Sequence, residues 1–223
     1  MNSHITKTMK KSITLLSFVI ITTIAFGQNY DNTFFTEFCI SVNRTDLKNN
    51  NTSDGFGFGI GTYNTLLTVK NLKFLFGVEF NRTTQFKENM YESKFSHATD
   101  LTYFINSISI PITAKFSSEK HVNFFCETGF FIDINIGASR LGTMHTYVPD
   151  ENNEIVYKEN NIEEKVSISA VNYGVSFGVG IEVPIANVKL IIKPEYKYGI
   201  LALYDYKDSI YNRYFRILIG IKI

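Results

Sequence analysis

Hydrophobic and polar residues alternate along most of the chain, beginning shortly after residue 30. The pattern is plainest at the C-terminus, where Phe215, Ile217, Ile219, Ile221 and Ile223 stand at every second position. Successive side chains of a β-strand point to opposite faces, so a period of two predicts strands with one apolar and one polar face. The sequence is therefore predicted to be all-β, with eight such runs at residues 33–42, 55–67, 72–86, 101–116, 122–138, 167–185, 188–203 and 212–223.

The links between these runs alternate in length. Three of them are short, at residues 68–71, 117–121 and 186–187. The other four are longer and polar, at residues 43–54, 87–100, 139–166 and 204–211. Tight turns at one end and extended loops at the other are typical of bacterial outer-membrane barrels. This favours an eight-stranded antiparallel transmembrane up-and-down β-barrel.

A soluble barrel of the lipocalin type alternates in the same way but points its apolar face inward. Two features favour the membrane barrel. Many runs reach ten residues or more, which is enough to cross a bilayer at a tilt. The polar faces are rich in Gly, Ser and Asn with charges of both signs, as expected for a narrow lumen rather than for a surface in water.

Charged residues on the polar faces are predicted to lie inside the barrel. They are Glu79, Lys115, Glu127, Asp133, Glu182, Lys193, Glu195, Lys197 and Arg216. Buried charges are tolerated only when they are paired, so Lys193 and Lys197 are expected to pair with acids on neighbouring strands, such as Glu182. Small barrels are filled by their own side chains, which favours a plug of ion pairs over a selective pore.

Tyrosines gather near the predicted outer ends of the last three runs, and some of them are expected to form an aromatic girdle at the membrane interface. These are Tyr173, Tyr198, Tyr204, Tyr206, Tyr211 and Tyr214. Prolines interrupt two runs, and since proline cannot donate to a strand ladder, Pro111 and Pro194 are predicted to mark bulges.

The N-terminus has the order of a secretory signal peptide. Lys7, Lys10 and Lys11 precede an apolar stretch at residues 13–26, and Ala25 and Gly27 are small residues before a cut at position 28. We therefore expect residues 1–27 to be a signal peptide and residues 28–223 to be an outer-membrane barrel domain. The alternative is an N-terminal anchor, for which the stretch is short, because a spanning helix needs about 20 apolar residues.

Composition excludes several other classes. Beyond the N-terminus there is no long apolar run, which excludes a helical membrane protein. The formal net charge of +1 gives no basic surface for nucleic acid. Cys39 and Cys126 fall in separate runs on opposite faces, and no second Cys or His stands at ligand spacing, so neither a metal site nor another cofactor is predicted.

Four segments carry a family resemblance. They are NSISIPITAKF (residues 106–116), VSFGVGIEVPI (175–185), KLIIKPEYKYGILAL (189–203) and the ending YFRILIGIKI. Together they resemble the PorT-like outer-membrane β-barrel proteins of Bacteroidetes. The resemblance implies an eight-stranded barrel in the outer membrane with no catalytic residues to carry over. It also implies outer-membrane lipids and envelope or secretion-machinery proteins as partners, since some members are linked to gliding motility and protein secretion.

Three functions follow as hypotheses. The first is a non-enzymatic barrel that contributes to envelope structure, protein export or surface interaction through its outer loops. The second is a small porin or transporter. The third is a lipid-modifying enzyme at the barrel rim, for which Ser96, His97 and Asp100 in one loop and His145 in another are the candidates.

Overall fold

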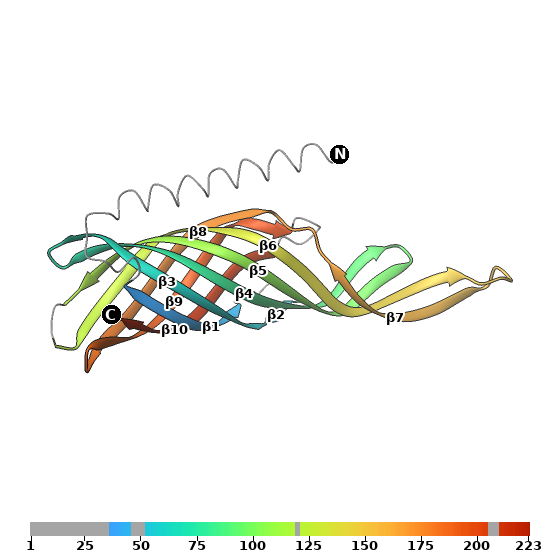
Figure 1. Cartoon of the computed structure of the whole chain (residues 1–223). Coiled ribbons are helices and arrows are strands. Elements are labelled where there is room, and N and C mark those ends of the chain that lie inside the picture. The colour runs from blue at the N-terminus through green and yellow to red at the C-terminus, as the bar shows by residue number, and fades with distance from the viewer. Residues whose placement is uncertain (1–35, 46–51, 119–120, 205–209) are drawn as a thin grey trace. The chain divides into compact units, whose positions relative to one another are not determined.

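The computed structural model describes residues 36–45, 52–118, 121–204 and 210–223, which form ten β-strands (Figure 1). The strands are β1 (Glu37–Thr45), β2 (Thr52–Asp54), β3 (Phe56–Val69), β4 (Leu72–Ser93), β5 (Ser96–Ser117), β6 (Asn123–Pro149), β7 (Ile155–Lys165), β8 (Val171–Ile185), β9 (Val188–Tyr204) and β10 (Ile210–Lys222). In these ranges no helix is long and apolar enough to cross a membrane. The predicted signal peptide at residues 1–27 lies outside the described residues.

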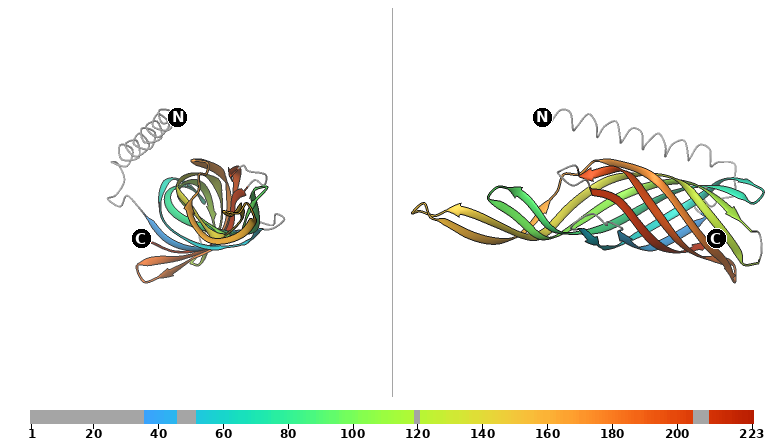
Figure 2. Two further views of the ribbon diagram at one scale, coloured as in Figure 1. Left: turned by 90° about the vertical axis from the view of Figure 1, so that its right-hand side faces the viewer. Right: turned by 180° about the vertical axis from the view of Figure 1, so that it is seen from behind.

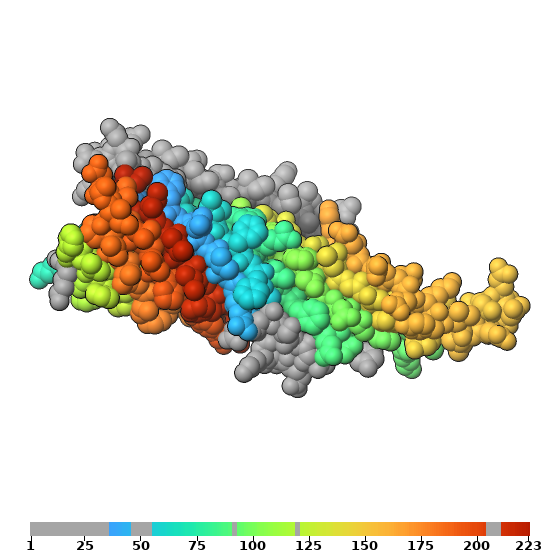
Figure 3. Space-filling model, turned by 90° about the horizontal axis from the view of Figure 1, so that it is seen from below, coloured from blue at the N-terminus to red at the C-terminus, as the bar shows by residue number. Residues whose placement is uncertain are grey.

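Eight of the strands close into a ring in the order β1, β10, β9, β8, β6, β5, β4 and β3, which the left view of Figure 2 shows end on. The seam joins the first strand to the last, and Glu37 pairs with Lys222 and Thr45 with Tyr214 in one unshifted antiparallel register. Figure 3 shows β1 (blue) lying between β10 (red) and β3 (cyan). Each ring strand has two antiparallel neighbours, so the predicted eight-stranded antiparallel barrel is confirmed.

Each strand of the ring turns a largely apolar face outward and a largely polar face into the lumen. On β10, Phe215, Ile217 and Ile219 are 44–50% exposed, whereas Arg216 and Leu218 between them are 2% exposed. Among the described residues, more polar and charged side chains than apolar ones are buried. A soluble domain has the opposite distribution, with apolar side chains inside.

Glycines on the inward face make room for aromatic rings. A Cβ atom at Gly180 would lie 2.4 Å from Cζ of Phe125, and one at Gly174 would lie 2.6 Å from Cζ of Phe131. Both rings are buried. The missing side chains therefore let two phenylalanines lie across a lumen that is narrow enough to be filled by side chains.

Two segments predicted to be loops are β-hairpins, and this corrects the prediction. Residues 87–100 continue β4 and β5 to a turn between Ser93 and Ser96. Residues 139–166 hold the end of β6 and all of β7, which pair without a shift from Ser139↔Lys165 to Pro149↔Ile155. Both hairpins project beyond the ring (Figure 1). The pattern misses them because nearly every residue of β7 is exposed, so its two faces do not differ in polarity.

Two of the short links form tight turns as predicted, after β3 and after β8, where Lys70 and Ala186 have φ values of 53° and 52°. The predicted bulges at the prolines are wrong. Pro111 pairs with Phe131 and Pro194 with Ile217, in registers that show no shift at either position. A proline removes one donor from a ladder, and here the ladder tolerates that loss without an inserted residue.

Candidate functional site

A buried network of ion pairs is centred on Arg216 in the lumen. Its guanidinium donates to both oxygens of Glu79, at 2.7 and 3.0 Å, and to Glu195 at 2.9 Å. Lys197 donates to Glu79 at 2.6 Å, and the Tyr63 hydroxyl donates to the same carboxylate. None of these five side chains is more than 4% exposed. The register therefore brings charges from β4, β9 and β10 into mutual contact, which is the condition under which buried charge is tolerated.

Lys193 extends this network from β9. Its Nζ lies 2.8 Å from Glu127 on β6 and 2.7 Å from Glu195 on its own strand. The expectation that Lys193 and Lys197 pair with acids on neighbouring strands, such as Glu182, is wrong: β9 is flanked by β8 and β10, whereas Glu127 on β6 and Glu79 on β4 reach these lysines across the lumen. In the β8–β9 register Glu182 lies two residues closer to the short turns than Lys193 does.

A second group of ion pairs lies near the short turns. Lys115 Nζ is 2.6 Å from Glu182 and 3.5 Å from Glu37, and Lys222 Nζ is 2.6 Å from Glu37. Glu37 was not among the predicted lumen charges. The signal for it was present, since it occupies an inward position in the same period-two pattern as its neighbours on β1.

Asp133 is the predicted lumen charge that departs from ion pairing. It is fully buried, and its Oδ2 accepts a hydrogen bond from the Asn212 amide at 3.1 Å. The ammonium of Lys197 instead donates to Glu79 and, at 3.0 Å, to Ser109. Asp133 is therefore held by an amide rather than by a cation.

An apolar layer crosses the lumen between the two groups of charges. It consists of Cys39, Tyr63, Phe125, Ile191 and Leu218, which come from five different strands and pack as one buried cluster. The adjoining cavity measures about 10 Å³, roughly the space that a single water molecule needs. The side chains of this layer are 2–5% exposed, so they fill the described part of the lumen at this level.

The tyrosines predicted to form a girdle are divided between the two faces. Tyr173 and Tyr198 point outward, at 47% and 39% exposure, and Tyr211 stacks with the outward-facing Arg213. Tyr214 is fully buried in the lumen, so its assignment to the girdle is wrong, because on β10 it shares the inward parity of Arg216. Tyr204 and Tyr206 are not among the side chains that the structure describes.

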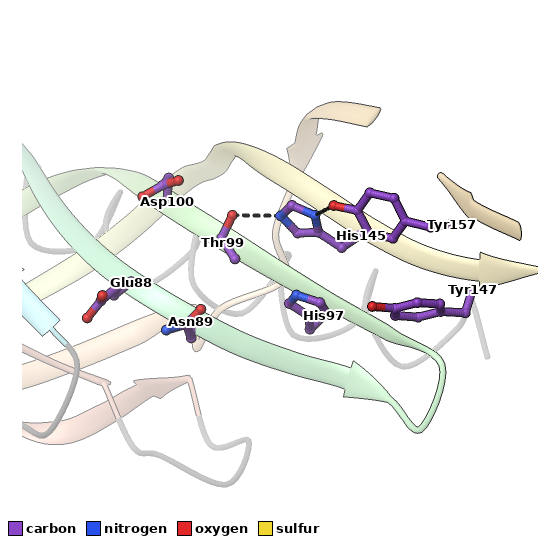
Figure 4. A pocket seen from close by; sticks show the side chains of 8 residues that line it. All are labelled: Glu88, Asn89, His97, Thr99, Asp100, His145, Tyr147 and Tyr157. Carbon is purple, nitrogen blue, oxygen red and sulfur yellow. Dashed lines mark hydrogen bonds between the residues drawn. The ribbon is translucent and has the colours of Figure 1, made fainter. Parts of the chain in front are cut away.

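An open pocket of about 620 Å³ lies on the projecting hairpins (Figure 4). It is lined by Glu88, Asn89, His97, Thr99, Asp100, His145, Tyr147 and Tyr157. The rings of His97 and His145 are stacked with centroids 4.6 Å apart, and those of His145 and Tyr157 are 5.8 Å apart. Cross-strand pairing produces this row, since His97 pairs with His145 across β5 and β6. In Figure 4 the carboxylates of Glu88 and Asp100 lie at the end of the pocket away from Tyr147.

The predicted grouping of Ser96, His97 and Asp100 does not form a nucleophile with its base. Ser96 and His97 are consecutive in a strand and so point to opposite faces, and the Ser96 hydroxyl lies 2.9 Å from that of Ser93. His145 instead bonds through Nε2 to the Thr99 hydroxyl at 2.9 Å, and its Nδ1 bonds to the Tyr157 hydroxyl. This arrangement can offer hydrogen bonds and ring faces to a ligand on the outer surface.

The acidic segment at residues 150–154 forms the turn between β6 and β7. Asp150 Oδ1 accepts hydrogen bonds from the backbone N–H groups of Asn152 and Glu154, both at 2.8 Å. Asn153 takes a positive φ of 63°, a conformation that asparagine tolerates well. These contacts give Asp150 a structural role in the turn. Among the described residues, no three side chains of His, Cys, Asp or Glu converge to hold a metal ion.

No family model and no curated protein sequence matches this chain. Several solved β-barrels resemble it at low similarity. Neisserial surface protein A is 13% identical, with 84% of this chain and 95% of that chain covered and a TM-score of 0.45. Ail of Yersinia pestis is 12% identical over 84% and 97%, with a TM-score of 0.33. The N-terminal barrel of Pseudomonas aeruginosa OprF is 8% identical over 84% and 96%, also with a TM-score of 0.33. Values this low carry no functional argument, and the fold assignment rests on the strand pairing itself.

Proposed function

We propose that this chain is an integral outer-membrane β-barrel with a closed lumen, which acts through its outer hairpins and not through transport. The observation that carries the proposal is the outward apolar face of the ring. Ile40, Ile60, Phe130, Phe177 and Ile219 belong to this band, and these five side chains are 47–71% exposed. Apolar surface in water costs about 25 cal/mol per Å². Acyl chains around the ring remove that cost, and closure of the ring leaves no unpaired strand edge in lipid.

The filled lumen supports a barrel that does not conduct. Arg216, Glu79 and Lys197 form connected, hydrogen-bonded ion pairs inside it. The apolar layer between the two groups of charges opposes the passage of hydrated solutes. A porin lumen is polar and filled with water, so the alternative of a small porin is disfavoured.

The hairpins supply the proposed surface for interaction. They extend the β4–β5–β6 sheet beyond the ring, add β7 to it, and hold the open pocket around His97 and His145. The resemblance to PorT-like proteins supports a role in envelope structure or in export and gliding machinery, with envelope proteins as partners. Export to the outer membrane agrees with the predicted signal peptide at residues 1–27.

Fractionation and solute flux test this proposal together. We expect the protein in the sarkosyl-insoluble outer-membrane fraction of expressing cells, since the apolar band requires lipid. In liposomes it should leave the rate of sugar-driven swelling equal to that of protein-free vesicles, while a general porin in parallel vesicles raises it. Recovery from periplasmic extract would contradict the location, and swelling above the protein-free rate would contradict the closed lumen.

A further inference from the structure

β7 is an edge strand on the hairpins that project beyond the ring (Figure 1). Among the described strands it pairs with β6 alone, over all 11 of its residues. Every side chain of β7 except that of Ile162 is exposed. The strand contains no proline and its register has no bulge, so two devices with which proteins commonly protect a free edge are missing from it.

The backbone hydrogen bonds show which residues of β7 face away from β6. In an antiparallel pair, every second residue points both its N–H and its C=O at the partner strand. At the tip of the hairpin, the N–H of Asp150 donates to the carbonyl of Glu154 at 2.8 Å. At its base, the N–H of Val166 donates to the carbonyl of Ala138 at 3.0 Å. Both pairs continue the unshifted β6–β7 register, so the even-numbered residues of β7 bond to β6.

The odd-numbered residues of β7 therefore turn their backbone groups outward. We term this row of outward N–H and C=O groups the β7 edge; it belongs to Ile155, Tyr157, Glu159, Asn161, Glu163 and Lys165. The bond from the Tyr147 N–H to the Phe95 carbonyl agrees, because it shows an odd-numbered residue of β6 pointing at the β4–β5 hairpin and not at β7. Donors and acceptors in such a row match the spacing of another strand.

The outer half of the β7 edge lies beyond the reach of the undescribed links between ring strands. Residues 46–51 and 205–209 are such links, and a link of this length extends at most about 12 Å from its two ends. Glu159 lies six residues beyond Lys165, the end of β7 nearer the ring, which is about 20 Å along an extended strand. Residues 28–35 precede β1 at the opposite end of the ring, where the short turns lie.

The side chains along the edge favour a basic partner. Glu159 and Glu163 lie on one face of β7, and both are exposed. Their paired residues on β6 are His145 and Leu141, so neither carboxylate has a Lys or Arg opposite it in that register. Opposite charges on directly paired residues stabilise adjacent strands. An added strand with two basic residues four positions apart would therefore complement both carboxylates.

We propose that the β7 edge binds an extended, basic segment of a partner protein, which adds to the sheet as an antiparallel strand. The proposal rests on the role of the outer hairpins given under Proposed function. In strand addition, main-chain hydrogen bonds supply the affinity and the side chains opposite the edge supply the specificity. A second copy of this chain fits less well, because it brings the same carboxylates to the contact, and like charges on paired residues destabilise a sheet.

A peptide of defined sequence tests the proposal on the full-length protein in phosphatidylcholine vesicles. The probe has nine residues, with lysine at its first and fifth positions, valine at its seventh and ninth, and threonine elsewhere. Paired antiparallel from Glu163 to Ile155, it places a lysine opposite Glu163 and another opposite Glu159. One control peptide has glutamate in place of both lysines. The other is N-methylated at its odd positions, which removes the donors that face β7 and keeps the charge. Fluorescence anisotropy of the labelled peptides measures binding.

Protein variants locate the contact. Asn161→Pro removes an outward N–H and leaves the β6–β7 bonds in place, since proline is tolerated on the free side of an edge strand. A double variant, Glu159→Gln with Glu163→Gln, removes the two charges. Its matched control is Glu88→Gln with Glu151→Gln, because these carboxylates are exposed and lie outside β7. Cold gel mobility verifies that each variant is folded.

We expect the wild type and the matched control to bind the lysine peptide at least tenfold more tightly than either control peptide. Asn161→Pro should abolish binding, and the double variant at Glu159 and Glu163 should weaken it at least fivefold. Equal binding of the N-methylated peptide, or no binding of the lysine peptide by the wild type, would overturn strand addition. Equal binding of the glutamate peptide would overturn the choice of a basic partner.

The oligomeric state in the same vesicles tests the competing occupant. A wild type that is dimeric, and that becomes monomeric as Asn161→Pro, would assign the β7 edge to a second copy and overturn the proposal. A monomeric wild type that binds the lysine peptide supports it. Membrane location and lumen closure are measured separately by fractionation and swelling, so a failure of peptide binding is distinguishable from a failure of the proposed function.

Discussion

Glu79→Gln should destabilise the barrel strongly without changing its shape. The Glu79 carboxylate accepts two hydrogen bonds from Arg216 and one from Lys197, at 2.6–3.0 Å, and it is 2% exposed. Glutamine retains the size of the side chain but removes the negative charge and turns an N–H group towards these donors. Two buried cations then lose their shared counter-charge. Removing one partner of a buried ion pair costs about 3–5 kcal/mol.

Urea titration of the protein in lipid vesicles measures this change, with the folded fraction read from gel mobility and circular dichroism. Urea slopes for small proteins are about 1–3 kcal/mol per M, so the unfolding midpoint should fall by at least about 1 M. Glu88→Gln is the matched control, because Glu88 is an exposed carboxylate on the same strand. It should change the free energy of unfolding by no more than about 0.5 kcal/mol.

A second substitution separates charge imbalance from a packing defect. Lys197→Met in the Glu79→Gln background removes one of the stranded cations, so the double variant should recover at least about 1 kcal/mol relative to the sum of the single changes. The reasoning is refuted if Glu79→Gln costs less than about 1 kcal/mol, or if the two substitutions are additive.

Further changes test lumen packing and the outward face. Gly180→Ala should lower stability by about 1–3 kcal/mol, because the new Cβ would lie 2.4 Å from a buried ring, whereas Gly137→Ala, with nothing within 4 Å, should be neutral in the same urea assay. Ile219→Lys should cost about 2–4 kcal/mol in bilayers, and the same change at Ile155 on β7 should cost almost nothing. Cys126, which is exposed on the outward face, should react in intact vesicles with a lipid-soluble maleimide but not with an impermeant one.

The ring could be predicted from the sequence because its two faces differ in polarity. On β10 the alternation of Ile217, Ile219 and Ile221 with Arg216 and Lys222 places every side chain correctly. The same rule fails on the projecting hairpins, where both faces of β7 are exposed and polarity carries no signal. Strands that extend beyond the apolar band are therefore not predicted by the sequence pattern, and only the backbone pairing in the structure reveals them.

The ion-pair partners within the lumen could not be predicted from the sequence. They depend on the shear of the barrel as well as on which side chains point inward. The alternation correctly predicts that Glu182 and Lys193 point inward, but only the three-dimensional structure shows that Lys115 on β5, which is not adjacent to β8, is the partner of Glu182. Tyr214 was assigned to the aromatic girdle because other tyrosines lie close to it in the sequence. Its position in the alternation of β10 is an inward one, and the side chain is buried.

The central claim is that the apolar face of the ring lies against acyl chains, and a single tryptophan tests it most directly. The chain has no tryptophan, so each substitution gives a sole tryptophan, whose emission is excited selectively at wavelengths where tyrosine does not absorb. In vesicles of acyl-brominated lipid, Ile219→Trp should be strongly quenched, and Phe95→Trp at the exposed tip of the β4–β5 hairpin should not be. Equal fluorescence of Ile219→Trp in brominated and ordinary lipid would contradict the account.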